Sequence, residues 1–330
     1  MRSFQCPTCA QPVFFENLSC LACGTQLGFD PASLDIIAVA TADGGGRGVA
    51  CANRALIHCN WIVGGDGGPL CPSCVMTPTV GGGSVPVASE AFERAKKRLI
   101  YDLTRFGLPI ADASPPLMFL LDESLPTGHS GGIVTLNVGE LDAIERQRQK
   151  SALQEPYRTL LGHLRHEVGH YYWALLVGDG PMLATFREVF GDETINYADA
   201  LARHYAEGPP ADWSSRFVSA YASAHPWEDW AETWAHYLHM VASLDSAEAE
   251  GIETRARGLK LGAAWPFQPA DTYRTETCEA LIQRWIPLTI ALNNLTRSMG
   301  HDDFYPFALP AAAHRKLAVV HDVIRQAART

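Results

Sequence analysis

Eight of the nine cysteines of this chain are crowded between Cys6 and Cys74, in a stretch rich in glycine and proline and poor in long apolar runs. A stretch of this composition cannot build an ordinary hydrophobic core, so its fold must depend on cross-links or metal ions. The first residues show no basic stretch followed by an apolar run, so we expect no secretory signal and a cytoplasmic protein, in which a reducing environment favours metal binding over disulfides. The cysteines therefore predict a small zinc-stabilised domain.

These cysteines form two sets of four. The first set consists of two Cys-x-x-Cys turns, each of which can present two thiolates to one tetrahedral zinc ion. The second set contains one such turn, but its other two members are widely spaced and His58 competes with Cys59 as a ligand. We expect one or two structural zinc ions, on Cys6, Cys9, Cys20 and Cys23, and on Cys51, Cys59, Cys71 and Cys74.

The charge of the chain bears on its partners. Acidic residues outnumber basic ones by 36 to 26, which gives a net charge of -10 and no general attraction to nucleic acid or anionic membranes. Before Glu90 the cationic side chains are Arg2, Arg47 and Arg54, too few for a ribbon that grips nucleic acid. No apolar run is long enough to span a bilayer. We therefore expect neither nucleic acid nor a membrane as partner.

A change in composition divides the 330 residues in two. The glycine-rich loop Val80 to Ser84 predicts a boundary between a domain of residues 1–85 and one of residues 86–330. Helical periodicity, with charged residues between the apolar positions, begins at Ala88. Two runs are β-prone, Leu117 to Leu121 and Gly132 to Asn137, and the sequence that follows them is mostly of helical pattern. The pattern predicts an α+β protein with a small sheet.

One predicted helix carries unusual polar residues. Tyr157 to Val177 has a broad apolar stripe, with Pro156 marking its start and Gly178 to Pro181 its end. Within it, His166 to His170 reads His-Glu-Val-Gly-His.

The two histidines of this segment lie one turn apart on one face. Their ring nitrogens can therefore converge on a metal ion, while Glu167 projects beside it to hold a water molecule. This is the geometry of a zinc hydrolase. A ligand at His163, one turn before His166, would crowd the same side of the metal, so we interpret His163 as a core residue or one that supports a ligand.

A catalytic zinc ion with an open position needs a third protein ligand. The helix that Pro226 predicts carries Glu228 and Glu232 one turn apart, in an aromatic-rich context where a carboxylate should be paired or metal-bound. We favour Glu228 as the ligand and Glu232 as an acceptor that orients a ligand histidine. The reverse assignment is the main alternative.

The metal motif followed by a Glu-x-x-Ala-Glu helix resembles the gluzincin metallopeptidases, and this helix is similar to that of anthrax lethal factor. That resemblance implies that the first glutamate, Glu228, binds zinc. It also implies that Tyr221, two turns earlier, donates to the oxyanion of the tetrahedral intermediate.

The chain from about Cys6 to about His239 resembles a bacterial family of zinc-binding metallopeptidases with an N-terminal zinc ribbon. The resemblance implies a rubredoxin-like ribbon followed by a mostly helical, zincin-like domain. The matching segments are Ala50 to Asn53, Cys59 to Trp61, Thr127 to His129, Glu155 to His163 and His225 to Glu232.

The expected activity is hydrolysis of a peptide or protein substrate by a zinc-activated water, with Glu167 as general base and one catalytic zinc ion. We expect an extended substrate to pair along the strand Gly132 to Asn137. The alternative is a catalytically silent, zinc-stabilised adaptor that recruits a partner protein through the ribbon. Glu167 argues against the adaptor, because a structural zinc ion needs no base.

Overall fold

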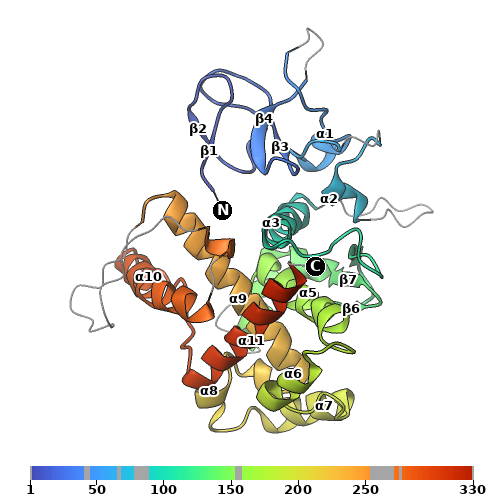
Figure 1. The fold of residues 1–330 in the computed structure, drawn as a ribbon, viewed down its shortest axis with the longest axis vertical. Coiled ribbons are helices and arrows are strands. Elements are labelled where there is room, and N and C mark those ends of the chain that lie inside the picture. The colour runs from blue at the N-terminus through green and yellow to red at the C-terminus, as the bar shows by residue number, and fades with distance from the viewer. Residues whose placement is uncertain are drawn as a thin grey trace.

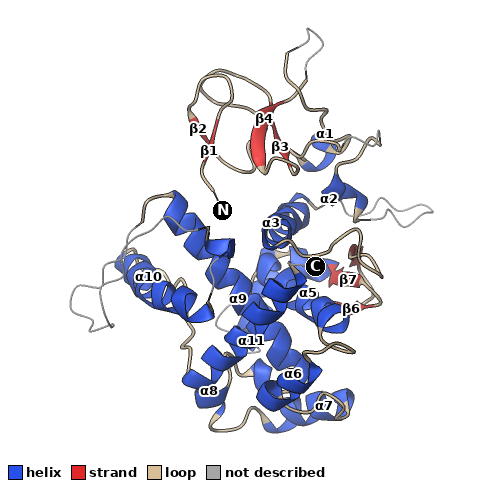
Figure 2. Cartoon of the chain, in the orientation of Figure 1, coloured by secondary structure: helices blue, strands red, loops and turns tan. Residues whose placement is uncertain are grey.

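The computed structural model describes residues 2–40, 45–64, 68–77, 89–152, 158–252, 271–274 and 277–328. Short strands and turns form the N-terminal part, which lies over one end of a mostly helical body (Figure 1). Besides this ribbon, the described strands gather in one small sheet at the side of the body (Figure 2). The α+β prediction is confirmed. The loop Val80 to Ser84 lies outside the described residues, so the domain limits stay a prediction.

The N-terminal part is built from two short antiparallel pairs, β1 (Phe4–Gln5) with β2 (Pro12–Val13) and β3 (Leu27–Asp30) with β4 (Asp35–Ala38). Two short helices follow, α1 (Arg54–Ile57) and α2 (Pro72–Val75). The rings of Phe15 and Phe29 pack against Tyr101 of the next helix, with centroids 5.5 and 5.9 Å from the tyrosine ring. Aromatic packing therefore joins the ribbon to the helical body.

Helix α3 (Glu90–Phe106) follows the predicted periodicity, and its N-terminus is capped by Ser89, whose Oγ accepts from the Phe92 N–H. Three of the charged residues in its first half, Glu93, Lys96 and Lys97, are buried, however. Lys96 is fully buried, with its Nζ 2.7 Å from Glu93 Oε1, and that oxygen also accepts from Thr77 Oγ1 at 3.1 Å. The reason is that the end of the ribbon covers this side of α3, so the charges are satisfied by each other and by Thr77.

The small sheet has the order β5-β7-β6, formed by β5 (Met118–Asp122), β6 (Gly128–Ser130) and β7 (Ile133–Asn137). β5 is parallel to β7 and β6 is antiparallel to it. The boundaries of the two predicted strands agree with those of β5 and β7 to within one residue. The strand β6 was missed because its three residues, Gly-His-Ser, show no apolar alternation. β7 is central and paired on both sides, so the prediction that it pairs with substrate is wrong. The edge strands of this sheet are β5 and β6.

Helix α5 (Leu160–Leu176) carries the metal motif. It begins three residues later than predicted, because Thr159 caps it: the Thr159 Oγ1 accepts from the Gly162 N–H at 3.0 Å. The predicted start signal at Pro156 lies outside the described residues. The helix ends one residue before the predicted end, ahead of Gly178.

Helix α9 (Pro226–Ala249) crosses α5 at close range. His225 caps it, accepting the Trp227 N–H at Nδ1, and the Trp230 indole donates to the Gly169 carbonyl at 2.9 Å. Gly169 permits the crossing, since a Cβ there would lie 2.9 Å from the Ala231 Cα. The crossing brings the two polar faces together.

The remaining helices surround this pair. They are η1 (Val138–Leu141), α4 (Ala143–Ala152), α6 (Leu183–Phe190), α7 (Tyr197–Glu207), α8 (Trp213–Arg216), η2 (Tyr221–Ser223), η3 (Thr272–Arg274), α10 (Cys278–Ser298) and α11 (Ala311–Ala327). Cys278 is buried in the core, as its isolation in the sequence suggests. Among the helices of the described residues, none combines the length and the apolar character that a bilayer crossing requires.

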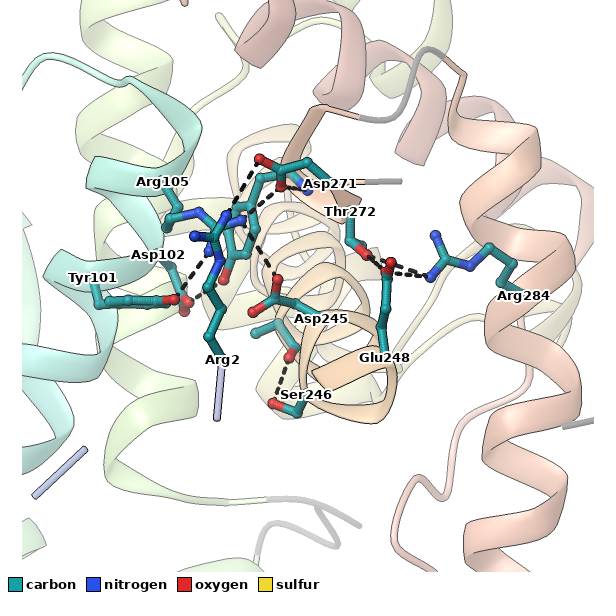
Figure 3. Close-up of polar contacts among 12 residues, drawn as sticks. Arg2, Tyr101, Asp102, Arg105, Asp245, Ser246, Glu248, Asp271, Thr272 and Arg284 are labelled. Atoms are coloured by element: carbon teal, nitrogen blue, oxygen red, sulfur yellow. Dashed lines mark hydrogen bonds and ion pairs between the residues drawn. The ribbon is translucent and has the colours of Figure 1, made fainter. Parts of the chain in front are cut away.

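A buried polar network ties α3 to α9 and to the segment before α10 (Figure 3). The Arg105 guanidinium donates to Asp271 at 2.6 Å and lies 3.5 Å from Asp245 of α9. One turn further along α9, Glu248 accepts from Thr272 and Arg284 at 2.8 and 3.0 Å. These ion pairs hold the far end of α9, away from the metal motif.

Candidate zinc centre and active site

Among the described residues, one group outside the ribbon could hold a metal ion: His166 and His170 of α5 and Glu228 of α9, whose ligand atoms lie within 4.8 Å of one another. The His166 Nε2 is 3.0 Å from Glu228 Oε2, and the His170 Nε2 is 3.5 Å from Glu228 Oε1. The helix crossing therefore places both imidazoles against one buried carboxylate.

The hydrogen bonding of His166 tests whether this group suits a metal. Its Nδ1 lies 2.8 Å from Glu232 Oε1, and a carboxylate there accepts a hydrogen bond from the ring N–H, which keeps the proton on Nδ1. The Nε2 then presents a lone pair to Glu228, whose Oε2 is buried and has no hydrogen bond within the described part of the chain. Two lone pairs facing each other call for a cation between them. Two imidazoles and one carboxylate form a donor set that zinc accepts with a position left open.

Glu232 lies on the far side of His166 from Glu228. Its second oxygen accepts from the Ser219 hydroxyl at 2.6 Å, so the carboxylate is held in place from both ends. A ligand histidine whose other nitrogen is fixed in this way keeps its tautomer and ring orientation. The geometry favours Glu228 as ligand and Glu232 as the residue that orients His166, rather than the reverse.

Glu167 is buried beside the two histidines and lines the same cavity. Burial raises the pKa of its carboxyl above the usual range for glutamate. A carboxylate with a raised pKa is a better proton acceptor near neutrality. Its place suits a general base rather than a ligand.

Two tyrosines stand over the group. The Tyr221 ring centroid lies 6.0 Å from that of His166, and the Tyr197 hydroxyl donates to Glu228 Oε1 at 2.6 Å. Burial, with the nearby Glu228 carboxylate, raises the pKa of both phenols above its usual value, so both remain protonated donors. Sequence reasoning missed Tyr197 because it lies at the start of α7 with no motif around it. Ser219 was missed because it too lies in a segment that carries no motif.

The cavity around these side chains has a volume of about 440 Å³. The rest of its described lining consists of Thr127, Gly128 and His129 at the β6 edge, and Trp173, Ala174 and Trp227. His129 accepts the Gly132 N–H at Nε2, and burial lowers the pKa of this histidine to about 4, so it is neutral. The cavity thus combines a sheet edge, a metal-ligand group and an aromatic side.

His163 lies outside the ligand group. Its Nδ1 pairs with the buried carboxylate of Glu140, which also accepts from Thr127 Oγ1 at 2.7 Å. His163 therefore links α5 to Glu140 of η1 and, through that carboxylate, to Thr127 just before β6. This contact supports the wall of the cavity and not a metal ligand.

The cysteines converge as two groups of four, each with its sulfur atoms within 4.8 Å of one another. In the first group Cys23 is exposed and Cys9 partly exposed, whereas the second group is buried throughout. His58, the alternative ligand, is not in the second group: its Nδ1 lies 2.8 Å from Glu90 on the surface. Zinc suits both four-thiolate groups.

Comparison with known proteins places these features in a family. Residues 88–323 match the family described as "putative zinc-binding metallo-peptidase", and residues 3–83 match a zinc-ribbon domain family. The chain is 41% identical to the uncharacterized proteins Mb2598c of Mycobacterium bovis and Rv2568c of Mycobacterium tuberculosis, over 99% of this chain and 96% of each relative. No solved structure matches. The chain belongs to this zinc-binding metallopeptidase family and carries a zinc-ribbon domain at its N-terminus.

Proposed function

We propose that the protein hydrolyses peptide bonds, with zinc held by His166, His170 and Glu228 and with Glu167 as general base. The observation that carries the proposal is the convergence of two imidazole nitrogens on a buried carboxylate, with Glu167 beside them in one cavity. Bound zinc supplies a Lewis acid at this point.

The side chains then have distinct roles. Glu167 takes a proton from the attacking water, whose oxygen bonds to the carbonyl carbon, and passes that proton to the amine nitrogen as the C–N bond breaks. Tyr221 donates to the carbonyl oxygen as negative charge develops there. Tyr197 and Glu232 hold Glu228 and His166 in position. The net change is one water consumed for each peptide bond broken.

The edge strand β6 offers the backbone contacts for substrate. It is the strand of the small sheet beside the cavity, and Gly128 and His129 line that cavity. An extended peptide can add to such an edge through main-chain hydrogen bonds. This role replaces the one predicted for β7.

Metal removal tests the proposal. The fully loaded chain should contain three zinc ions. A chelator that removes the ion held by His166, His170 and Glu228 should abolish cleavage of a peptide mixture, with the products detected by mass spectrometry. Zinc added back should restore it. Metal analysis would show that two zinc ions remain bound, and circular dichroism would show that the protein stays folded. Cleavage that persists after the third ion is lost, or a loaded protein that cleaves nothing, would contradict the proposal.

The helix crossing provides a second prediction. Alanine is favoured over glycine in a helix by about 1 kcal/mol, but at position 169 its Cβ would press on the backbone of Ala231, and overpacking costs about 1–3 kcal/mol. Gly169→Ala should therefore lower the melting temperature and weaken zinc binding, because it moves His166 and His170 away from Glu228. Gly64→Ala, where a Cβ meets nothing within 4 Å, is the matched control. Unchanged zinc affinity in Gly169→Ala would show that the crossing does not set the site.

A further inference from the structure

One side of the cavity is formed by three aromatic rings, Trp173 of α5, Trp227 of α9 and Tyr197 of α7, here called the aromatic wall. The Trp227 ring lies 5.3 Å from Trp173 and 5.9 Å from Tyr197, measured between centroids. Both indoles are half-buried and Tyr197 is 36% exposed, so the rings pack together and still present surface to the cavity.

The aromatic wall adjoins the reacting atoms. Trp173 follows His170 by three residues on the same helix, Trp227 directly precedes Glu228, and Tyr197 donates to the Glu228 carboxylate. Each ring therefore either lies on the same helix as a proposed ligand or is hydrogen-bonded to one. A substrate group that touches the wall would belong to a residue next to the scissile bond.

The wall is also uncharged. In the described lining, the carboxylates are Glu167 and Glu228, both assigned to the metal centre, and the neutral His129 faces the cavity from the β6 side. The small, exposed Ala174 leaves room beside Trp173. A flat apolar side chain gains contact with such rings, whereas a carboxylate would lose hydration and find no cation among the described lining residues.

We propose that the aromatic wall receives the side chain adjacent to the scissile bond, so that the substrates are peptides or unfolded segments with an aromatic or large aliphatic residue at that position. This inference rests on the proposed function. An apolar pocket of this kind discriminates between side chains by about 10–100-fold in kcat/KM.

The test uses peptides blocked at both ends that differ at one position beside the cleaved bond, in two series, one for each side of that bond. In at least one series we expect Phe and Leu to exceed Asp by about 10-fold or more in kcat/KM. Trp227→Ala should remove this preference and Trp227→Phe should keep it. Ala174→Lys, a change at an exposed position, should raise the relative use of Asp even if Trp227→Ala does not fold. Phe14→Ala, at a ribbon residue that is 74% exposed, is the control and should change neither rate.

The outcomes separate the two levels of the argument. Zinc-dependent cleavage with equal rates for Phe and Asp, or a preference that both Trp227→Ala and Ala174→Lys leave intact, would overturn the aromatic-wall inference alone. The absence of zinc-dependent cleavage in every peptide of both series would overturn the proposed function, and this inference with it.

Discussion

Glu167→Gln should lower kcat/KM for peptide hydrolysis by about 10²–10⁴-fold, the range over which a positioned general base contributes, while the zinc content of the protein stays the same. Glutamine keeps the shape of the side chain but cannot accept a proton. Glu167 is buried beside His166 and His170 and is not one of the three grouped ligands, so its replacement should leave the ion in place. Steady-state kinetics on a blocked peptide and metal analysis of the same sample would check both halves of the prediction.

Substitutions of the two tyrosines over the site, Tyr221 and Tyr197, can be compared with Glu167→Gln. Tyr221→Phe removes a donor proposed to act on the reacting carbonyl, and loss of such a donor costs about 10²–10³-fold in kcat. Tyr197→Phe removes the hydrogen bond to Glu228 and should act first on zinc affinity. Equal turnover by wild type and Glu167→Gln would exclude Glu167 as the base. If neither protein cleaved any peptide, the adaptor alternative would be favoured.

The central part of the site could be read from the sequence because its geometry is local. His166 and His170 are one helical turn apart, so helix periodicity alone puts them on one face beside Glu167. Glu228 and Glu232 were candidates for the same reason. The crossing of α5 and α9 sets Glu228 against Nε2 and Glu232 against Nδ1 of His166, and this arrangement supports the proposal of Glu228 as the ligand. Such a crossing depends on packing around Gly169, and a single sequence does not specify it.

The residues that sequence reasoning missed are those whose place is decided by tertiary structure. Tyr197 and Ser219 come from separate short helical or irregular segments that carry no motif, and they reach the site because α7 and the turn before α9 fold back over it. The edge strand β6 has no apolar alternation, so periodicity could not find it. Lys96 is charged in a helix that reads as amphipathic, yet contact with the ribbon buries it. In each case a neighbour distant in sequence outweighs the local signal.

Loss of the second cysteine site should damage the peptidase domain more than loss of the first. The residues directly after Cys74 join the small sheet and α3: the Met76 carbonyl accepts from the Phe119 N–H of β5 at 2.8 Å, and Thr77 contacts the buried pair of Glu93 and Lys96. β5 pairs with β7 and β7 with β6, the strand that borders the cavity. The second cysteine site is thus connected to the β6 side of the cavity through two successive strand pairings, β5 with β7 and β7 with β6.

The matched variants are Cys71→Ser with Cys74→Ser and Cys6→Ser with Cys9→Ser, each of which should lose one zinc ion. A structural zinc site contributes about 10–16 kcal/mol of apparent binding energy, comparable with the whole stability of a domain, about 5–15 kcal/mol. We expect the first pair to abolish cooperative unfolding and peptide cleavage together, with faster amide exchange in β5 and β6. The second pair should keep most activity, because its site lies at the exposed end of the ribbon, where Cys23 is open to solvent. Equal loss of activity in both variants would mean that the ribbon acts as one unit on the peptidase domain. A larger loss from the Cys6 and Cys9 pair would instead place the coupling at the contact of Phe15 and Phe29 with Tyr101.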